Sequence, residues 1–101
     1  MAKTCMTERE IKRRATVSKF AVKRAALEAA MNDVTATAES RLEARKKFQA
    51  LPRNSSPVRL RNRCALTGRP RGVFSNFGIG RSKLRDLMMA GFVPGVTKAS
   101  W

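Results

Sequence analysis

Residues Arg53 to Gly72 read RNSSPVRLRNRCALTGRPRG. This stretch contains six arginines and no acidic residue, and it is too rich in Pro and Gly to form a helix. Arginine suits phosphate because its planar guanidinium donates paired hydrogen bonds and can also stack on bases. The stretch therefore predicts an Arg-rich extended loop that contacts a nucleic-acid backbone.

The spacing of the central arginines supports this prediction. Arg59, Arg61 and Arg63 alternate, and in extended backbone they would line one face about 6.5–7 Å apart, close to the spacing of phosphates along a strand. Neutral donors for phosphate and ribose oxygens accompany them: Ser55, Ser56, Asn62 and Thr67. A disordered basic tail is the alternative, but turn residues and apolar anchors such as Val58 and Leu60 count against it.

The same charge excess extends over the whole chain. Its 22 Lys and Arg outnumber 7 Asp and Glu, and the formal net charge of +15 repels itself in a compact state unless a polyanion neutralises it. Between Ala44 and Arg85 there are twelve basic residues and no acid. With 101 residues and only six aromatics, the chain lies between a small folded domain and a segment that orders fully only on its target.

Cysteine usage and hydropathy indicate the compartment. Cys5 and Cys64 lie far apart without CxxC spacing, which favours a reducing cytoplasm over a disulfide framework. The first residues reach charged side chains at once, so a secretory signal is not expected. The longest uncharged run, Leu87 to Thr97, has 11 residues, whereas a membrane helix needs about 20. No membrane span is expected.

Residues 8–31 contain no Gly or Pro and are rich in Ala, Lys, Arg and Glu, which predicts a long helix. Its apolar residues fall on two sides of the helix. One side carries Ile11, Ala15, Val22 and Ala29, and the other carries Phe20, Leu27 and Met31. Such a helix suits a segment buried among several partners, one of them anionic, although a mostly solvated helix fits the pattern equally well.

The rest of the chain predicts shorter elements. A second helix is expected from about Ala38 to Ala50, capped by Thr35 or Thr37 and stopped by Pro52. Residues 52–80, punctuated by Pro and Gly, predict a loop and a short hairpin. Residues 82–90 predict a third helix with Leu84, Leu87 and Met88 on one face, closed by Gly91.

Other classes of function fit the sequence less well. An enzyme needs titratable groups in a cleft, but the chain has no His, no Tyr and a single acid after residue 43, and no general base stands near Cys64 in sequence. A membrane-surface peptide needs one apolar helix face, which is lacking. A DNA-architectural protein shares the charge and is the alternative, but a helical arm with an Arg-studded loop suits irregularly folded RNA better.

Three motifs carry a family resemblance: NRCALTGRPRG at Asn62 to Gly72, FGIGR at Phe77 to Arg81, and PGVTKASW at Pro94 to Trp101. Together they resemble the bacterial small-subunit ribosomal protein fourteen family in its long, zinc-free form, and the likeness covers the whole chain. The resemblance implies a structural constituent of the small ribosomal subunit that binds 16S-type rRNA in the 3′ major domain of the 30S head and supports head assembly and translation. It also implies neighbouring small-subunit proteins three, ten and nineteen, and a bacterial cytoplasmic ribosome, with an organellar ribosome as the alternative.

The family's short form holds zinc with two CxxC pairs, twelve residues apart. Those positions correspond here to Cys64, Thr67, Gly80 and Lys83, so a single possible ligand survives. The resemblance thus implies a zinc-ribbon-like knuckle without zinc or another cofactor, held by packing of four side chains: Phe74, Phe77, Leu84 and Leu87.

The predicted fold is mainly α with little β. An elongated N-terminal arm of two helices occupies residues 1–51, and the Arg-rich loop, the C-terminal knuckle (short hairpin plus helix) and the tail occupy residues 52–101 as one structural unit on RNA. The tail is expected to dock, with Lys98 and Ser100 on phosphate and Trp101 stacked on a base or on protein.

No catalytic residue, metal ligand, small-molecule substrate or homo-oligomer is predicted. The predicted rRNA-binding residues are polar or basic, apart from the single Trp. They are Arg53, Ser55, Ser56, Arg59, Arg61, Asn62, Arg63, Thr67, Arg69, Arg71, Arg81, Lys83, Arg85, Lys98, Ser100 and Trp101.

Overall fold

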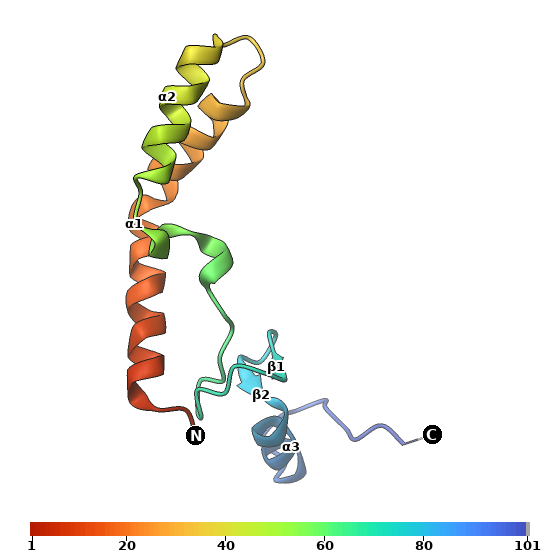
Figure 1. The fold of residues 1–101 in the computed structure, drawn as a ribbon. Helices are drawn as coiled ribbons and strands as arrows, with labels where there is room; N and C mark the ends of the chain where they lie inside the picture. The colour runs from red at the N-terminus through yellow and green to blue at the C-terminus, as the bar shows by residue number, and fades with distance from the viewer. Residues whose placement is uncertain (101) are drawn as a thin grey trace. The chain divides into compact units, whose positions relative to one another are not determined.

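The structure is a computed structural model that describes residues 1–100. Within them the chain forms three α-helices, two 3-10 helices and one two-stranded antiparallel sheet (Figure 1). The predicted class, mainly α with a short hairpin, is confirmed. The chain divides into two compact units: an arm unit, Arg9–Leu60, and a knuckle unit that combines Met1–Glu8 with the segment from Arg61 onward. The predicted division at residue 51 concerns the RNA-bound chain and stays a prediction.

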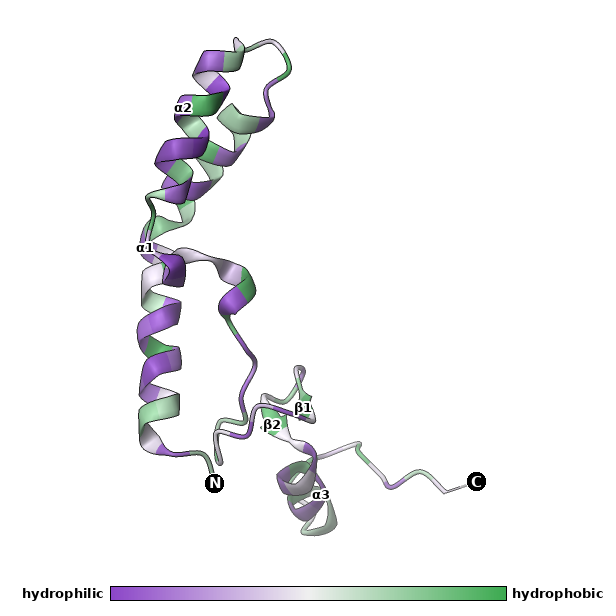
Figure 2. Cartoon of the chain, viewed as in Figure 1, coloured by the Kyte–Doolittle hydropathy of each residue, from purple (hydrophilic) through white to green (hydrophobic). Residues whose placement is uncertain are grey.

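The first helix, α1, spans Thr4–Asn32 and begins four residues before the predicted start. Nothing in residues 4–7 breaks a helix, and the Thr7 hydroxyl donates a hydrogen bond to the Thr4 carbonyl at 2.7 Å. Hydrophilic and hydrophobic bands alternate along α1 in Figure 2. Of its two apolar sides, the one with Phe20 and Leu27 is half-buried, whereas Val22 on the other is 84% exposed. One side therefore packs within the arm unit and the other faces outward.

The second helix, α2, spans Ala38–Gln49, close to its predicted bounds. Thr37 is the N-cap, and its side chain accepts a hydrogen bond from the Ser40 amide at 3.4 Å, which confirms one of the two predicted caps. The turn from α1 is short, so α2 lies beside the C-terminal half of α1 (Figure 1). The small side chain of Ala44 is the buried one on α2.

Two 3-10 helices follow, η1 at Arg53–Ser55 and η2 at Pro57–Arg59, where the sequence predicted an extended loop. Pro57 stands at the start of η2, where its fixed φ is compatible with a helical turn and its missing amide hydrogen is not needed. Arg59 therefore lies in a turn and not in an extended strand. The prediction of three arginines in one extended row is wrong at this residue.

The knuckle unit contains the hairpin and the third helix. Strand β1, Val73–Phe74, pairs antiparallel with β2, Ile79–Gly80, and α3 follows at once as Arg81–Met89. The predicted hairpin and helix are thus confirmed. Leu84 of α3 is buried and Leu87 is half-buried, in agreement with the predicted packing.

Two of the predicted knuckle-packing residues are only partly covered. Phe74 and Phe77 remain 50% and 45% exposed. Each two-residue strand has a single neighbouring strand, and Phe77 lies in the turn between the two strands. The prediction that packing holds the knuckle is thus not confirmed for these two rings.

The N-terminal segment packs against the knuckle, which the sequence did not predict. The Ala2 amide donates a hydrogen bond to the Thr67 carbonyl at 2.9 Å. The next residue, Gly68, has φ +70°, and a Cβ there would stand 2.9 Å from side-chain carbons of both Ala2 and Thr7. Only glycine combines this backbone conformation with so close an approach.

Among the described residues, no helix has both the length and the apolar character that a bilayer crossing requires.

Candidate nucleic-acid interface

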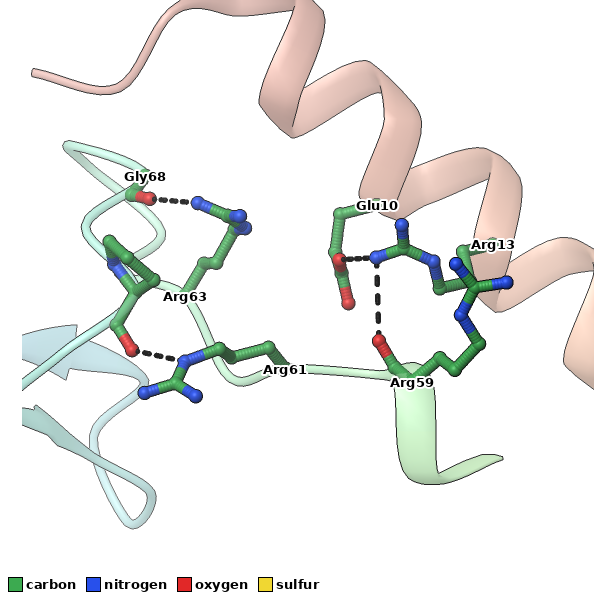
Figure 3. Close-up of polar contacts among 7 residues, drawn as sticks. Glu10, Arg13, Arg59, Arg61, Arg63 and Gly68 are labelled. Atoms are coloured by element: carbon green, nitrogen blue, oxygen red, sulfur yellow. Dashed lines mark hydrogen bonds and ion pairs between the residues drawn. The ribbon is translucent and has the colours of Figure 1, made fainter. Parts of the chain in front are cut away.

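A buried carboxylate organises one part of the arm unit. Glu10 is buried on α1, and its carboxylate lies 2.7 Å from the Arg13 guanidinium (Figure 3). Arg13 also donates a hydrogen bond to the Arg59 carbonyl at 3.4 Å, which ties α1 to η2. Because Glu10 balances the charge of Arg13, this arginine serves the fold, while the Arg59 side chain is exposed.

A second arginine of α1 is held by an aromatic ring. The Arg24 guanidinium carbon lies 4.3 Å from the centroid of the Phe48 ring, within cation–π range. Its terminal nitrogen donates a hydrogen bond to the Ser55 hydroxyl at 3.4 Å. Ser55 is buried, and its own hydroxyl donates to the Pro52 carbonyl, so its position is fixed. Two contacts thus orient the half-buried Arg24 side chain.

Arg24 lines a pocket of about 510 Å³, which we call the arginine pocket. No acidic residue lines it, and two exposed arginines from η1 and η2 join Arg24 there. Three arginines line one opening, and the guanidinium of Arg24 is held in place, so the pocket is suited to an anion such as phosphate. The lining residues are Arg24, Phe48, Gln49, Leu51, Pro52, Arg53, Ser56 and Arg59.

Two arginines after η2, Arg61 and Arg63, donate hydrogen bonds to backbone carbonyls of the loop that precedes the hairpin. The Arg61 Nε donates a hydrogen bond to the Pro70 carbonyl at 2.8 Å, and the Arg63 guanidinium donates to the Gly68 carbonyl at 3.0 Å (Figure 3). Arg63 is half-buried, so it braces the loop more than it projects from it. Arg61 remains exposed and lines a pocket of about 480 Å³ with Asn62 and Arg71, again without an acid.

The loop from Cys64 to Arg69 forms a cradle around the Cys64 thiol. The Cys64 amide bonds to the Arg69 carbonyl at 3.0 Å, the Gly68 amide bonds to the Cys64 carbonyl at 2.8 Å, and Cys64 is 2% exposed. A Cβ on Gly80 would stand 3.7 Å from the Cys64 Sγ. Within residues 1–100, no group of three or more His, Cys, Asp or Glu side chains gathers to hold a metal ion.

This cradle favours the thiolate. The Thr67 hydroxyl is the largest cause, and with the amides of Gly80, Thr67 and Leu66 it lowers the pKa of Cys64 from 9.0 to about 7 against the opposing effect of burial. Because this pKa is lower in the fold than in the unfolded chain, the thiolate stabilises the fold. That stabilisation is complete above about pH 9 and is lost as the pH falls through about 7.

We therefore expect Cys64 to titrate with a midpoint near 7 in a Cys5→Ser background, followed by the ultraviolet absorbance of the thiolate. The Thr67→Val variant removes the donated hydroxyl bond, so its midpoint should rise. The stability difference between the Cys5→Ser chain and its Cys64→Ser derivative should grow between about pH 7 and 9. A midpoint near 9.0 in the folded chain would contradict the cradle as described.

The start of α3 adds a third basic opening. Gly80 is its N-cap without a side-chain hydrogen bond, no acid lies in the first turn, and Arg81 and Lys83 stand there instead. Cations at a helix N-terminus are unfavourable alone, but an anion at that end is favoured by the helix dipole. Lys83 also lines a pocket of about 430 Å³ with Thr67 and Arg69, and its amine lies 3.7 Å from Asp86 in an exposed ion pair.

The structure thus sorts the predicted rRNA-binding residues by exposure. Ser55 is buried, and Ser56, Arg63 and Thr67 are half-buried and tied into the fold or a pocket wall. Trp101 lies outside the described residues. The exposed members are Arg53, Arg59, Arg61, Asn62, Arg69, Arg71, Arg81, Lys83, Arg85, Lys98 and Ser100. Arg24 was missing from the predicted set, because its partners Phe48 and Ser55 lie far from it in sequence.

A comparison with known families matches the part of the chain that carries the predicted site residues. The model of the family described as ribosomal protein S14p/S29e matches residues 47–100. The matched range contains η1, η2, the hairpin and α3, and with them all the predicted polar and basic site residues. It leaves out α1 and therefore Arg24.

Proposed function

Since the chain belongs to the ribosomal protein S14p/S29e family, we propose that it binds 16S-type rRNA in the 3′ major domain of the 30S head and supports assembly of the head. The family places it in the ribosome as a structural constituent of the small subunit, in association with rRNA. The bacterial cytoplasmic ribosome and contacts with small-subunit proteins three, ten and nineteen are part of the proposal.

The arginine pocket is the observation that carries the rRNA-binding proposal. Its three arginines come from α1, η1 and η2, and no acid lines it. The Phe48 ring and the Ser55 hydroxyl hold the Arg24 guanidinium. A side chain that is already ordered loses less entropy when it binds phosphate than a mobile surface lysine does. The acid-free pockets of the knuckle unit add further cations: Arg61, Arg69, Arg71 and Lys83. The tail residues Lys98, Ser100 and Trp101 complete the proposed contacts.

We further propose that the knuckle is the zinc-free form. A structural zinc site needs four Cys or His donors, whereas the four corresponding positions here offer the Cys64 thiol, a Thr67 hydroxyl, no side chain at Gly80 and a cation at Lys83. The Thr67 hydroxyl and nearby amides stabilise the Cys64 thiolate where a metal would otherwise do so. The residues present do not fit zinc, and packing around Leu84 with the N-terminal contact at Thr67 holds the knuckle.

Reconstitution of small subunits tests the proposal. The purified chain, added to particles reconstituted without it, should pellet with them and remain bound after washing at the salt concentration used for reconstitution. Double-stranded DNA added in excess over the particles should not displace the bound chain. If the chain stays in the supernatant while other head proteins pellet, the assignment to the head fails, and displacement by DNA would favour the DNA-architectural alternative.

A further inference from the structure

The knuckle unit has a small core and could bury more apolar surface, yet two of its aromatic side chains remain about half exposed. Phe74 and Phe77 line a groove of about 690 Å³ together with residues of α3 and the tail; we call it the aromatic groove. Large apolar side chains that gather around one opening usually mark a binding surface. The lining residues are Phe74, Phe77, Arg81, Ser82, Leu84, Arg85, Met88, Val96, Thr97 and Ala99.

Three segments build this groove. Phe74 belongs to β1 and Phe77 to the hairpin turn, where the amides of Phe77 and Gly78 bond to the Phe74 carbonyl at 3.2 and 2.8 Å. These bonds fix the spacing between the two aromatic residues. Buried Leu84 and half-buried Met88 of α3 form an apolar base, and half-buried Val96 contributes from the tail.

The polar members of the groove have one sign of charge. Arg81 and Arg85 are exposed and stand four residues apart on α3, so they project from the same face of the helix. No acidic residue lines the groove, and Ser82 and Thr97 supply hydroxyls. An occupant must therefore combine a flat or apolar part with a negative charge.

An unpaired nucleotide has this combination. Its base offers a π-face to the Phe rings, its phosphate offers an anion to the two arginines, and its base edge and ribose hydroxyl can bond to Ser82 and Thr97. A base inside a duplex has both faces covered, so only a nucleotide turned out of a helix can use the rings. An apolar protein segment would satisfy the rings and leave both guanidinium groups without an anion.

We propose that the aromatic groove takes one unpaired rRNA nucleotide, with its base stacked on Phe74 or Phe77 and its phosphate on Arg81 and Arg85. This inference rests on the proposed rRNA binding and adds a subsite of defined chemistry to it. It also assigns a binding role to two residues that were expected from the sequence to hold the knuckle by packing.

The test replaces the rings and keeps their apolar volume. A Phe74→Leu, Phe77→Leu chain should bind a naked 3′ major domain rRNA fragment about fivefold to a hundredfold more weakly, with the salt dependence unchanged, because stacking is lost and phosphate contacts remain. Chemical probing should show one unpaired nucleotide that the unaltered chain protects and the double variant leaves reactive. Phe92→Leu is the matched control, because Phe92 is 76% exposed and does not line the groove.

Further variants separate the possible outcomes. Phe77→Trp in the Phe74→Leu background restores a π-face and should restore protection, which a mere packing defect would not allow. Arg81→Ala with Arg85→Ala should lower the salt slope by about one, because both guanidinium groups contact the same phosphate. Unchanged affinity and protection in the double Leu variant, with the unaltered chain still bound, would overturn the groove proposal alone. A defect that appears only when other head proteins are present would assign the groove to a protein and also overturn it. Failure of the unaltered chain to bind the fragment would count against the rRNA-binding proposal itself.

Discussion

Affinity for a 3′ major domain rRNA fragment is expected to fall by about a thousandfold or more when salt rises from about 50 to about 200 mM. A net charge of +15 and acid-free pockets in both units mean that binding is dominated by the release of counterions from phosphates. Neutralising about six to ten phosphates accounts for a decrease of this size.

The measurement is a binding titration at several salt concentrations, plotted as the logarithm of affinity against the logarithm of salt. The slope reports the number of neutralised phosphates. A neutral osmolyte at matched osmolality is the control, because it leaves the counterions unchanged. A nearly flat salt response would rule out an electrostatic interface, whatever the affinity at low salt.

Local signals in the sequence were sufficient for most of the secondary structure. Thr37 as a cap and the spacing of Leu84, Leu87 and Met88 each act within about one helical turn. They therefore predict α2 and α3 without knowledge of the fold. The two 3-10 helices were missed. A Pro-containing Arg-rich stretch is equally compatible with extended backbone and with tight turns. The hydrogen bond from Arg13 to the Arg59 carbonyl, which holds η2, joins residues 46 positions apart in the sequence.

The candidate site was predictable in composition and not in arrangement. The sequence predicted binding cations along residues 53–85, and the structure leaves most of them exposed. The sequence could not show that Arg63 turns back to the Gly68 carbonyl while Arg24 joins Arg53 and Arg59 in one pocket. Phe74 and Phe77 look like core residues in a sequence, because hydropathy carries no information on whether a short hairpin has enough neighbours to cover them. Contacts between distant residues decide these points.

The arginine pocket leads to the second large expected effect. Replacing Arg24, Arg53 and Arg59 together with Ala should weaken rRNA binding by about a hundredfold or more at about 0.1 M salt and lower the salt slope by about two to three. The reason is that Arg24 is ordered by Phe48 and Ser55 before binding, so its phosphate contact is made with little further loss of freedom. Arg24→Lys alone keeps the charge and loses the planar fork, so it should recover only part of the affinity lost in Arg24→Ala.

The matched control is the triple variant of Arg45, Lys46 and Lys47 to Ala, which removes the same charge from exposed positions of α2 in the same unit. Cations near the C-terminal end of a helix are favoured by its dipole, which explains their presence without RNA. Mobile exposed side chains lose more freedom on binding, so this variant should bind more tightly than the pocket variant by about tenfold. Circular dichroism should show the same helix content in both chains. Equal losses of affinity in two equally helical variants would mean that net charge alone determines binding and that the arginine pocket has no special role.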